Sequence, residues 1–306
     1  MQAKKKIRAL AALALCFTLA LPVGGALAAN GAPVAENLEL TTYRNVCVGG
    51  QMAAVDPEGD AVTFEITTQP AKGTVEATDD GRFVYTPDTN RKGRDYFGYR
   101  AVDATGARSQ EATVIINIEK QKTQTSYADM TGHPAAYAAV ALAESGIFTG
   151  ESIGSVQVFL PEQAVTRGEF LSMCMTLSGE ELLNGVMATG FADDADIEAW
   201  LKPYVATALL DGVVSGYSVS GGAVFNAAEP ITWQEAAVML DNVLDTTDVA
   251  VTALTGSVAE WATQAASNLA ACGVITEGEA FSETLTRADA AEMLVRALAV
   301  LEAREN

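Results

Sequence analysis

The sequence Thr-Arg-Gly-Glu at positions 166–169 precedes an apolar helical run, and the arrangement recurs as Thr-Trp-Gln-Glu at 232–235 and Thr-Arg-Ala-Asp at 286–289. A Thr followed three residues later by Glu predicts a capping box. In this device the Thr hydroxyl accepts from the third helical amide, and the Glu side chain accepts from the Thr amide. Asp289 is a shorter form of the same device. These stretches therefore predict one helix start that is used three times.

Arg167 and Arg287 follow the capping residues Thr166 and Thr286. The positive end of the helix dipole disfavours a cation there by about 0.3–1 kcal/mol. Free amides at a helix start together with a guanidinium favour an anion, so one hypothesis is that each Arg binds a carboxylate or phosphate. If this hypothesis holds, replacing either Arg by Ala should barely affect folding. The alternative is that each Arg lies over its neighbours or pairs with a nearby acid.

The same order of features surrounds each of the three starts. A first helix is predicted at 134–145, 198–210 and 258–271, and each of these helices is closed by a Gly at 146, 212 or 273. A loop and a Phe then lead to the capped second helix; these Phe residues are Phe159, Phe225 and Phe281. One helix pair does not cover its own apolar faces, so we expect three pairs to share one core.

The chain starts with a basic segment, an apolar run and the small residues Ala-Leu-Ala at 26–28, which together predict a signal peptide over 1–28. Its removal takes away four basic residues and no acidic ones, so the formal charge changes from −20 to −24. Nucleic acid is therefore not an expected partner, because binding a duplex requires a basic surface. We expect no membrane span in the mature chain and no covalent anchor in its short polar tail.

The remaining cysteines are Cys47, Cys174 and Cys272, and they are widely spaced, so neither a disulfide framework nor a zinc site is indicated. They are expected to be buried as small apolar residues. His133 is the only histidine. A Ser-His-Asp triad would have to use it, but its place just before a Pro is more typical of the residue that enters a helix. No catalytic residue and no cofactor is predicted.

Residues 31–120 alternate with period two in several short segments that are separated by Gly, Pro and Asp clusters, which predicts an all-β sandwich. The order Asp-Pro-Glu-Gly-Asp at 56–60, Phe-Val-Tyr-Thr-Pro at 83–87 and Val-Asp-x-x-Gly at 102–106 resembles bacterial Ig-like, cadherin-like domains of cell-surface proteins. Asp56, Glu58 and Asp60 are a candidate calcium site. The favoured alternative is a structural turn, because Ca²⁺ takes six or more oxygens.

Beyond a polar linker at 121–126, three segments carry a further resemblance. Tyr-Ala-Asp at 127–129, Phe-Ala-Asp at 191–193, Trp200, Trp261 and the Thr-Arg stretches are similar to the motifs of S-layer homology repeats. The resemblance places the repeats at 127–180, 190–246 and 253–301. It implies an all-α pseudo-trimer of three repeats, a helical spindle, whose grooves bind a pyruvylated secondary cell-wall polysaccharide.

The resemblance assigns Arg167 and Arg287, with the capping residues Thr166 and Thr286, to polysaccharide contacts. Copy two has Trp233 in place of the Arg, so its groove lacks the cation, but the Trp233 ring could still stack on a sugar face. Copy one has Pro134 at the position of the family's Trp. Fewer than three working grooves are therefore expected. Trp200, Trp261 and the three loop Phe residues are more typical of a core than of sugar platforms, with groove edges as the exception.

The expected function is that of a non-catalytic, secreted protein that the repeats hold to the bacterial cell wall or S-layer, with the Ig-like domain as a spacer or adhesive module. That domain's protein or glycan partner is not identified by the sequence. The alternative is an adhesin or S-layer assembly subunit whose helical repeats bind protein partners.

Overall fold

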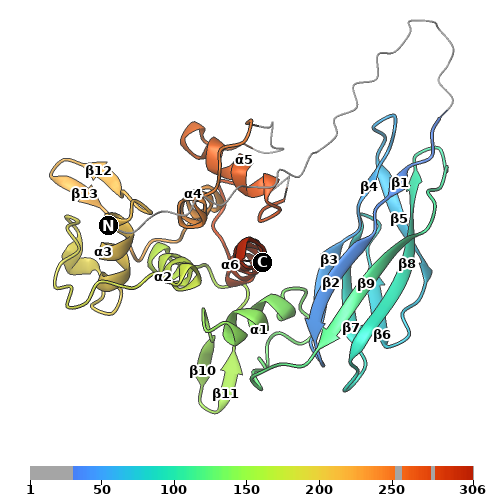
Figure 1. The fold of residues 1–306 in the computed structure, drawn as a ribbon, viewed down its shortest axis with the longest axis horizontal. Coiled ribbons are helices and arrows are strands. Elements are labelled where there is room, and N and C mark those ends of the chain that lie inside the picture. Colours follow the sequence, from blue (N-terminus) through green and yellow to red (C-terminus); the bar gives the residue numbers. More distant parts are fainter. Residues whose placement is uncertain (1–29, 252–256, 277–279, 306) are drawn as a thin grey trace, which may run out of the picture.

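The computed structural model describes residues 30–251, 257–276 and 280–305, so the predicted signal peptide lies outside the described residues. Figure 1 shows a strand-rich region, here called the sandwich, beside a helical region, here called the helical unit. Among the described residues, no helix is both long enough and apolar enough to cross a membrane.

The sandwich contains two main sheets. One has the strand order β2-β9-β8-β5, with β2 parallel to β9 and the other neighbours antiparallel; the second has the order β3-β7-β6, and β1 pairs with β4. The strands are β1 (Val34–Ala35), β2 (Leu38–Tyr43), β3 (Val48–Gln51), β4 (Ala54–Val55), β5 (Val62–Thr68), β6 (Gly73–Ala77), β7 (Arg82–Pro87), β8 (Gly93–Asp103) and β9 (Ala112–Glu119).

The period-two pattern of the sequence produces the core of the sandwich. Along β9, buried residues alternate with half-buried ones, and the buried set faces Phe97 and Tyr99 of β8 and Tyr85 of β7. Asp95 is also buried, and its carboxylate accepts from the amides of Ala71 and Lys72 and from the Tyr85 hydroxyl. The predicted strand-rich region is confirmed.

The helical unit contains three helix pairs. The first helices are α1 (Ala136–Glu144), α3 (Lys202–Leu210) and α5 (Thr263–Ala271); the capped second helices are α2 (Arg167–Ser178), α4 (Trp233–Leu244) and α6 (Arg287–Glu305). Hairpins β10–β11 (Glu151–Ile153, Val156–Val158) and β12–β13 (Tyr217–Val219, Gly222–Val224) lie within the first and second pairs, and short 3₁₀ turns η1 (Asp194–Asp196) and η2 (Glu260–Ala262) precede α3 and α5.

The three first helices start later than their sequence patterns predict. For α3 the reason is Pro203, which lies in the first turn, where its missing amide costs no hydrogen bond. All three end as predicted, with a left-handed Gly at φ 71°, 77° and 71° for Gly146, Gly212 and Gly273. The following amide then bonds back across the last turn, from Ile147 to Leu142 at 2.9 Å, Val213 to Ala208 at 2.8 Å and Val274 to Leu269 at 2.9 Å.

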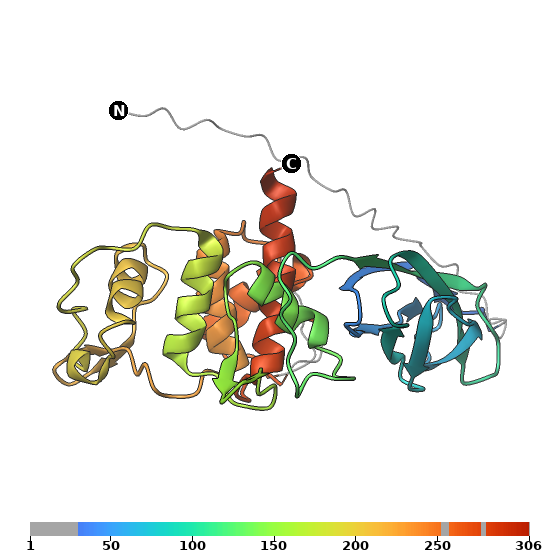
Figure 2. The same cartoon turned by 90° about the horizontal axis from the view of Figure 1, so that it is seen from below.

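A closed ring of backbone hydrogen bonds joins the three pairs just before the capped helices. The Val165 amide donates to the Leu285 carbonyl at 3.0 Å, Leu285 donates to Ile231 at 2.9 Å, and Ile231 donates to Val165 at 2.9 Å. Each first helix packs on the second helix of the preceding copy: α3 on α2, α5 on α4 and α1 on α6. The second helices therefore lie at the centre, as Figure 2 shows from the side.

The sandwich docks on the first helix pair. The Gly49 amide of β3 donates to the Pro134 carbonyl at 2.8 Å, and the rings of Tyr43 and Tyr137 lie 5.3 Å apart. A Cβ at Gly49 would come within 2.7 Å of the Pro134 Cβ, so only Gly fits this contact without a shift. The predicted linker is also held, because Glu144 accepts from the Lys122 and Thr123 amides.

Candidate functional site

The capped starts of α2, α4 and α6 were the predicted centre of function, and their capping is confirmed. Thr166 accepts from the Glu169 amide at 3.2 Å while Glu169 accepts from the Thr166 amide at 2.9 Å. Thr232 and Glu235 repeat both bonds, and Asp289 takes the same role opposite Thr286.

The amides expected to be free at these starts have protein partners. The Arg167 amide donates to Glu229 and the Gly168 amide to Ala227, both at 2.9 Å. The corresponding amides of α4 and α6 donate to carbonyls in the same way: Trp233 to Glu283, Gln234 to Phe281, Arg287 to Gln163 and Ala288 to Pro161. The expectation of free amides is therefore wrong. The ring of backbone bonds brings the loop of the next copy onto each helix start.

The Arg167 side chain crosses into the second copy. Its Nε donates to the Phe225 carbonyl at 3.1 Å, its Nη1 lies 3.4 Å from Glu235 Oε1, and its guanidinium lies 4.7 Å from the centre of the Tyr217 ring. Tyr217 donates its hydroxyl to Glu235. Burial raises the pKa of Glu235, but the hydrogen bonds from Tyr217 and Thr232 and the charge of Arg167 bring that pKa below its ordinary value.

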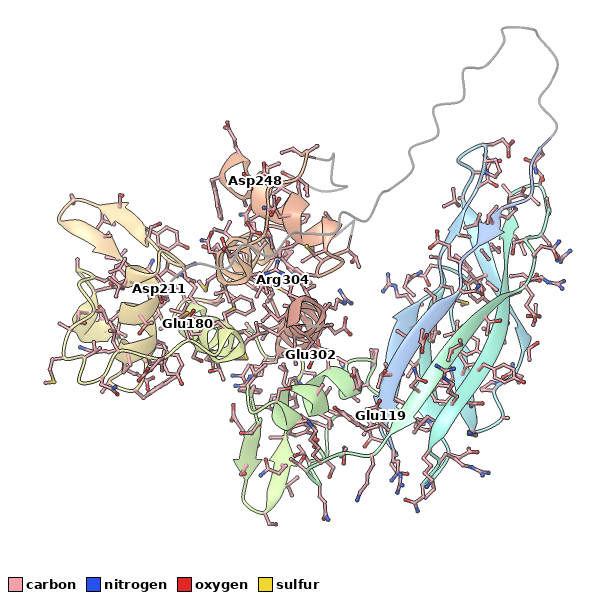
Figure 3. The ribbon with its side chains drawn as sticks, in the orientation of Figure 1. Glu119, Glu180, Asp211, Asp248, Glu302 and Arg304 are labelled. Carbon is pink, nitrogen blue, oxygen red and sulfur yellow. The ribbon has the colours of Figure 1, made fainter. Side chains whose placement is uncertain are left out.

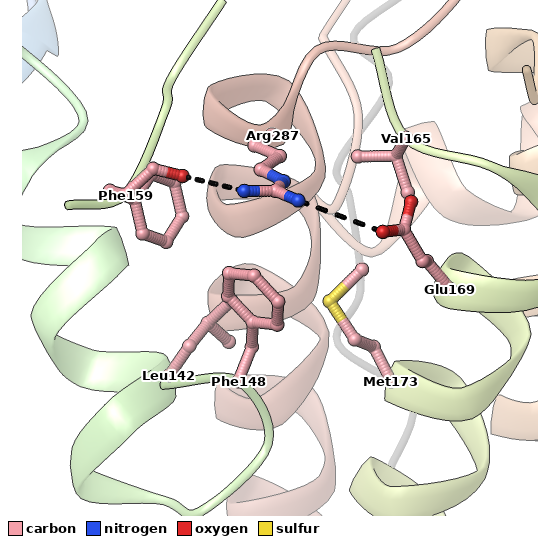
Figure 4. A pocket seen from close by; sticks show the side chains of 7 residues that line it. All are labelled: Leu142, Phe148, Phe159, Val165, Glu169, Met173 and Arg287. Atoms are coloured by element: carbon pink, nitrogen blue, oxygen red, sulfur yellow. Dashed lines mark hydrogen bonds and ion pairs between the residues drawn. The ribbon is translucent and has the colours of Figure 1, made fainter. Parts of the chain in front are cut away.

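Arg287 crosses into the first copy in the same way (Figure 4). Its Nη1 donates to the Phe159 carbonyl at 3.2 Å, and its Nη2 lies 2.5 Å from Glu151 and 3.6 Å from Glu169. The adjoining cavity has a volume of about 10 Å³, which is room for about one water and not for a sugar ring.

Both arginines are thus buried, at 6% and 5% exposed, and both have acidic partners. The alternative of pairing with a nearby acid describes this structure. Removal of Arg167 would leave the half-buried Glu235 without its cation, which argues against the expectation that the arginines matter little for folding. That expectation stays a prediction. Sequence reasoning missed Glu151 and Tyr217 because hairpin residues so far from an Arg in the sequence carry no signal of contact with it.

Trp233 occupies the equivalent start in copy two, and only 9% of it is exposed. It lies in the shared helical core, so most of its ring faces protein and not solvent. The polysaccharide-contact role of this residue stays a prediction.

The other predicted aromatic core residues divide into two groups. Phe159, Phe225 and Phe281 are buried as expected, whereas Trp200 and Trp261 are 52% and 58% exposed, so the core prediction is wrong for both Trp residues. The reason is local, because the neighbouring Leu201 and Ala262 fill the core instead.

A residue next to or near each exposed Trp contacts a capped start. A Cβ at Gly168 would come within 2.4 Å of Leu201 Cδ2, and the Ala259 amide donates to the Gln234 side chain at 3.2 Å. In copy one the corresponding position is Pro134, which contacts Gly49 of the sandwich and is itself exposed. Two copies therefore present an exposed aromatic ring beside a helix start, and the first copy presents the docked sandwich.

The remaining candidate residues have structural contacts. Asp56 Oδ1 accepts from the Glu58 and Asp60 amides, both at 3.0 Å, and Glu58 accepts from Gly31 at 3.1 Å. Over residues 30–251, 257–276 and 280–305, no group of three or more His, Cys, Asp or Glu side chains is placed to hold a metal.

His133 and the cysteines were also considered for chemistry in the sequence. His133 Nδ1 accepts from the Ala135 amide at 3.2 Å, which confirms its role at a helix entry. Cys47 and Cys174 are buried as expected, but Cys272 is exposed at the end of α5, so the prediction of three buried cysteines is wrong for this residue.

Taken together, the three central helices carry acids and cations at both ends. Figure 3 labels Glu180, Asp211 and Asp248, which are spread over the helical unit, and Glu302 and Arg304, which belong to the last turns of α6. Acids at helix carboxyl ends add to the negative end of the dipole, which disfavours an anion there. The buried arginines lie at the opposite, amino ends of α2 and α6.

The chain combines a β-sandwich with a following unit of interlocked helix pairs. Family models identify them: a bacterial cadherin-like domain matches residues 30–120, and an S-layer homology domain matches residues 126–171. The chain thus carries both domains in the order that the sequence predicted.

A curated protein that matches part of this chain is named as a surface-layer protein. The "Surface-layer 125 kDa protein" of Lysinibacillus sphaericus is 29% identical over 150 residues, which is 47% of this chain and 12% of that protein. The chain thus spans about an eighth of the length of this relative. Together with the S-layer homology match, this likeness indicates association with the cell surface or cell wall.

Similar solved structures include an endo-fucoidan hydrolase of glycoside hydrolase family 107, with 25% identity, coverage of 32% of this chain and 15% of that chain, and a TM-score of 0.25. Another is a variant of the SrpA adhesin from Streptococcus sanguinis, with 17% identity, coverage of 32% and 63%, and a TM-score of 0.24. Likenesses at this level support no functional argument.

Proposed function

We propose that this chain is a non-catalytic cell-surface protein whose helical unit binds a secondary cell-wall polysaccharide, with pyruvyl carboxylates as the recognised anions. In this proposal the helical unit comprises three S-layer homology repeats at 127–180, 190–246 and 253–301. The sandwich over 31–120 projects as a spacer or adhesive module.

The observation that carries the proposal is that the first start brings a buried Arg and an exposed Trp to the amino end of one central helix. At the first start, Arg167 supplies a cation and Trp200 an aromatic face. A guanidinium suits a carboxylate, and an exposed ring suits the apolar face of a sugar. The match to an S-layer homology domain at 126–171 supports the same ligand class.

The second start has the aromatic face without the cation, since Trp233 replaces the Arg while Trp261 remains exposed. The third start has Arg287, but Pro134, which contacts Gly49 of the sandwich, holds the position where the Trp would be. Under this proposal the three sites are therefore unequal, and Thr166 and Thr286 act by ordering the helix starts that carry the arginines.

A wall-binding assay on the mature chain tests the proposal. Trp200→Ala should weaken binding to purified walls about fivefold, because loss of a stacking contact costs about 1 kcal/mol. Tyr96→Ala is the matched control, since Tyr96 is an aromatic residue of the sandwich that is 60% exposed. Equal retention on walls stripped of their polysaccharide would overturn the proposal and favour a protein partner.

A further inference from the structure

The two arginine sites share a loop carbonyl and a capping acid as partners, and one of the differences between them lies at a single hairpin position. Glu151 begins β10 and is paired with Val158, and Tyr217 begins β12 and is paired with Val224. Each of these first residues contacts the arginine of the preceding copy: Glu151 contacts Arg287, and Tyr217 contacts Arg167. The hairpins therefore place an acid over one arginine and a phenol ring over the other.

This difference changes the charge of each site. Arg287 lies 2.5 Å from Glu151 and 3.6 Å from Glu169, so one cation faces two carboxylates. Arg167 has one carboxylate partner among the described residues, Glu235 at 3.4 Å. The Arg287 site thus carries a net charge of about −1, whereas the Arg167 site is about neutral. The carboxylate of a ligand is therefore disfavoured at the Arg287 site and tolerated at the Arg167 site.

Glu151 is also placed as an added carboxylate would be. Its side chain is 47% exposed, on a strand whose three residues are all exposed, whereas Arg287 is 5% exposed. Phe148 lies over the guanidinium at 5.3 Å, and the Phe159 carbonyl occupies Nη1. Glu151 thus reaches from the surface to Arg287 Nη2, the same atom that lies near Glu169.

We infer that Glu151 is an internal ligand that occupies the carboxylate position at Arg287, so that a monocarboxylate saccharide binds at Arg167 and is excluded from Arg287. The inference rests on the proposed function and deepens it, since it assigns the ligand to one of two sites. Glu151 and Tyr217 are the residues that decide between them.

Calorimetric titration of the mature chain with a monosaccharide that bears one pyruvate ketal tests the inference, because it counts sites. The wild type should bind one equivalent. Glu151→Gln should bind a second equivalent, with an affinity for the second site at least tenfold above the wild type. The reciprocal change Tyr217→Glu should weaken the wild-type site at least tenfold. Glu180→Gln is the matched control, because it removes one exposed acid that lies far from both arginines in the fold.

The outcomes separate this inference from the proposed function. Binding of one equivalent by both the wild type and Glu151→Gln, with a lowered Tm in the variant, would make Glu151 a structural ion-pair partner and overturn the inference alone. Two equivalents in the wild type would also overturn it alone. No binding of the ketal by any variant would overturn both the inference and the proposed carboxylate ligand. For the same sugar without pyruvate, every variant should have the same affinity as the wild type.

Discussion

The sandwich and the helical unit solve the same problem of burial in opposite ways. The sandwich buries side chains from its own strands, with Tyr137 as a partly buried neighbour from α1. In the helical unit a single core takes residues from all three helix pairs, and three backbone bonds close a ring through Val165, Ile231 and Leu285. A destabilising substitution should therefore affect only the sandwich when it lies in the sandwich, but all three copies when it lies in the helical unit.

Buried charge follows the same division. In the sandwich, Asp95 accepts three hydrogen bonds from residues of the same domain. In the helical unit, Arg167 and Arg287 each pair with acids of a different copy. Leaving such a charge unpaired costs several kcal/mol, so these pairs specify which copy follows which. The arginines therefore have a part in assembling the unit in addition to the binding proposed for them.

The largest effect is expected from removing one copy. A chain that ends at Leu254 loses α5, α6 and the Leu285 member of the ring, so the remaining two copies have uncovered apolar faces. We expect the helical signal in circular dichroism to be lost, while amide exchange shows the strands of the sandwich still protected. A control chain that lacks only residues 305–306 should behave like the full chain. Native helicity in the truncated chain would contradict the shared core.

Much of this architecture is predictable from local sequence signals. The capping boxes at Thr166 and Thr232 and the Gly ends at 146, 212 and 273 are determined within a few residues, and all are present. The period-two pattern likewise predicts the strands of the sandwich. These features depend on backbone geometry and on short-range hydrogen bonds, which neighbouring residues control.

The contacts of the candidate site are not predictable in this way. The partner of Arg287, Glu151, lies 136 residues away in the sequence. The exposure of Trp200 depends on whether Trp200 or Leu201 faces the core, which a one-residue change of register would reverse. The loss of free amides at the helix starts follows from the ring of copies, which exists only in the folded unit. Sequence patterns do not encode such long-range pairings in a form that one chain reveals.

An intermediate effect is expected where the two regions meet. Gly49→Val places a branched side chain where a Cβ alone lies 2.7 Å from the Pro134 Cβ. The clash should separate the sandwich from α1 while both regions keep their own folds. Small-angle scattering should then show a larger radius of gyration, and proteolysis within 121–126 should become faster. Thr74→Val on the exposed strand β6 is the matched control. An unchanged profile for Gly49→Val would show that the junction adapts without undocking.

The smallest effect is expected from the caps, and it tests whether the helical unit melts as one. Thr166→Ala and Thr286→Ala each remove a side-chain acceptor for a helix amide, at 3.2 Å in both cases. Each should lower the free energy of unfolding by about 1 kcal/mol, which is about 2–4 °C in Tm for a unit of this size.

Because the core is shared, both variants should shift the same calorimetric transition and leave the transition of the sandwich unchanged. Thr→Ser at either position keeps the hydroxyl and should restore most of the loss. Separate transitions for the two variants would mean that the copies melt independently, and the ring through Val165, Ile231 and Leu285 would then contribute little to cooperativity.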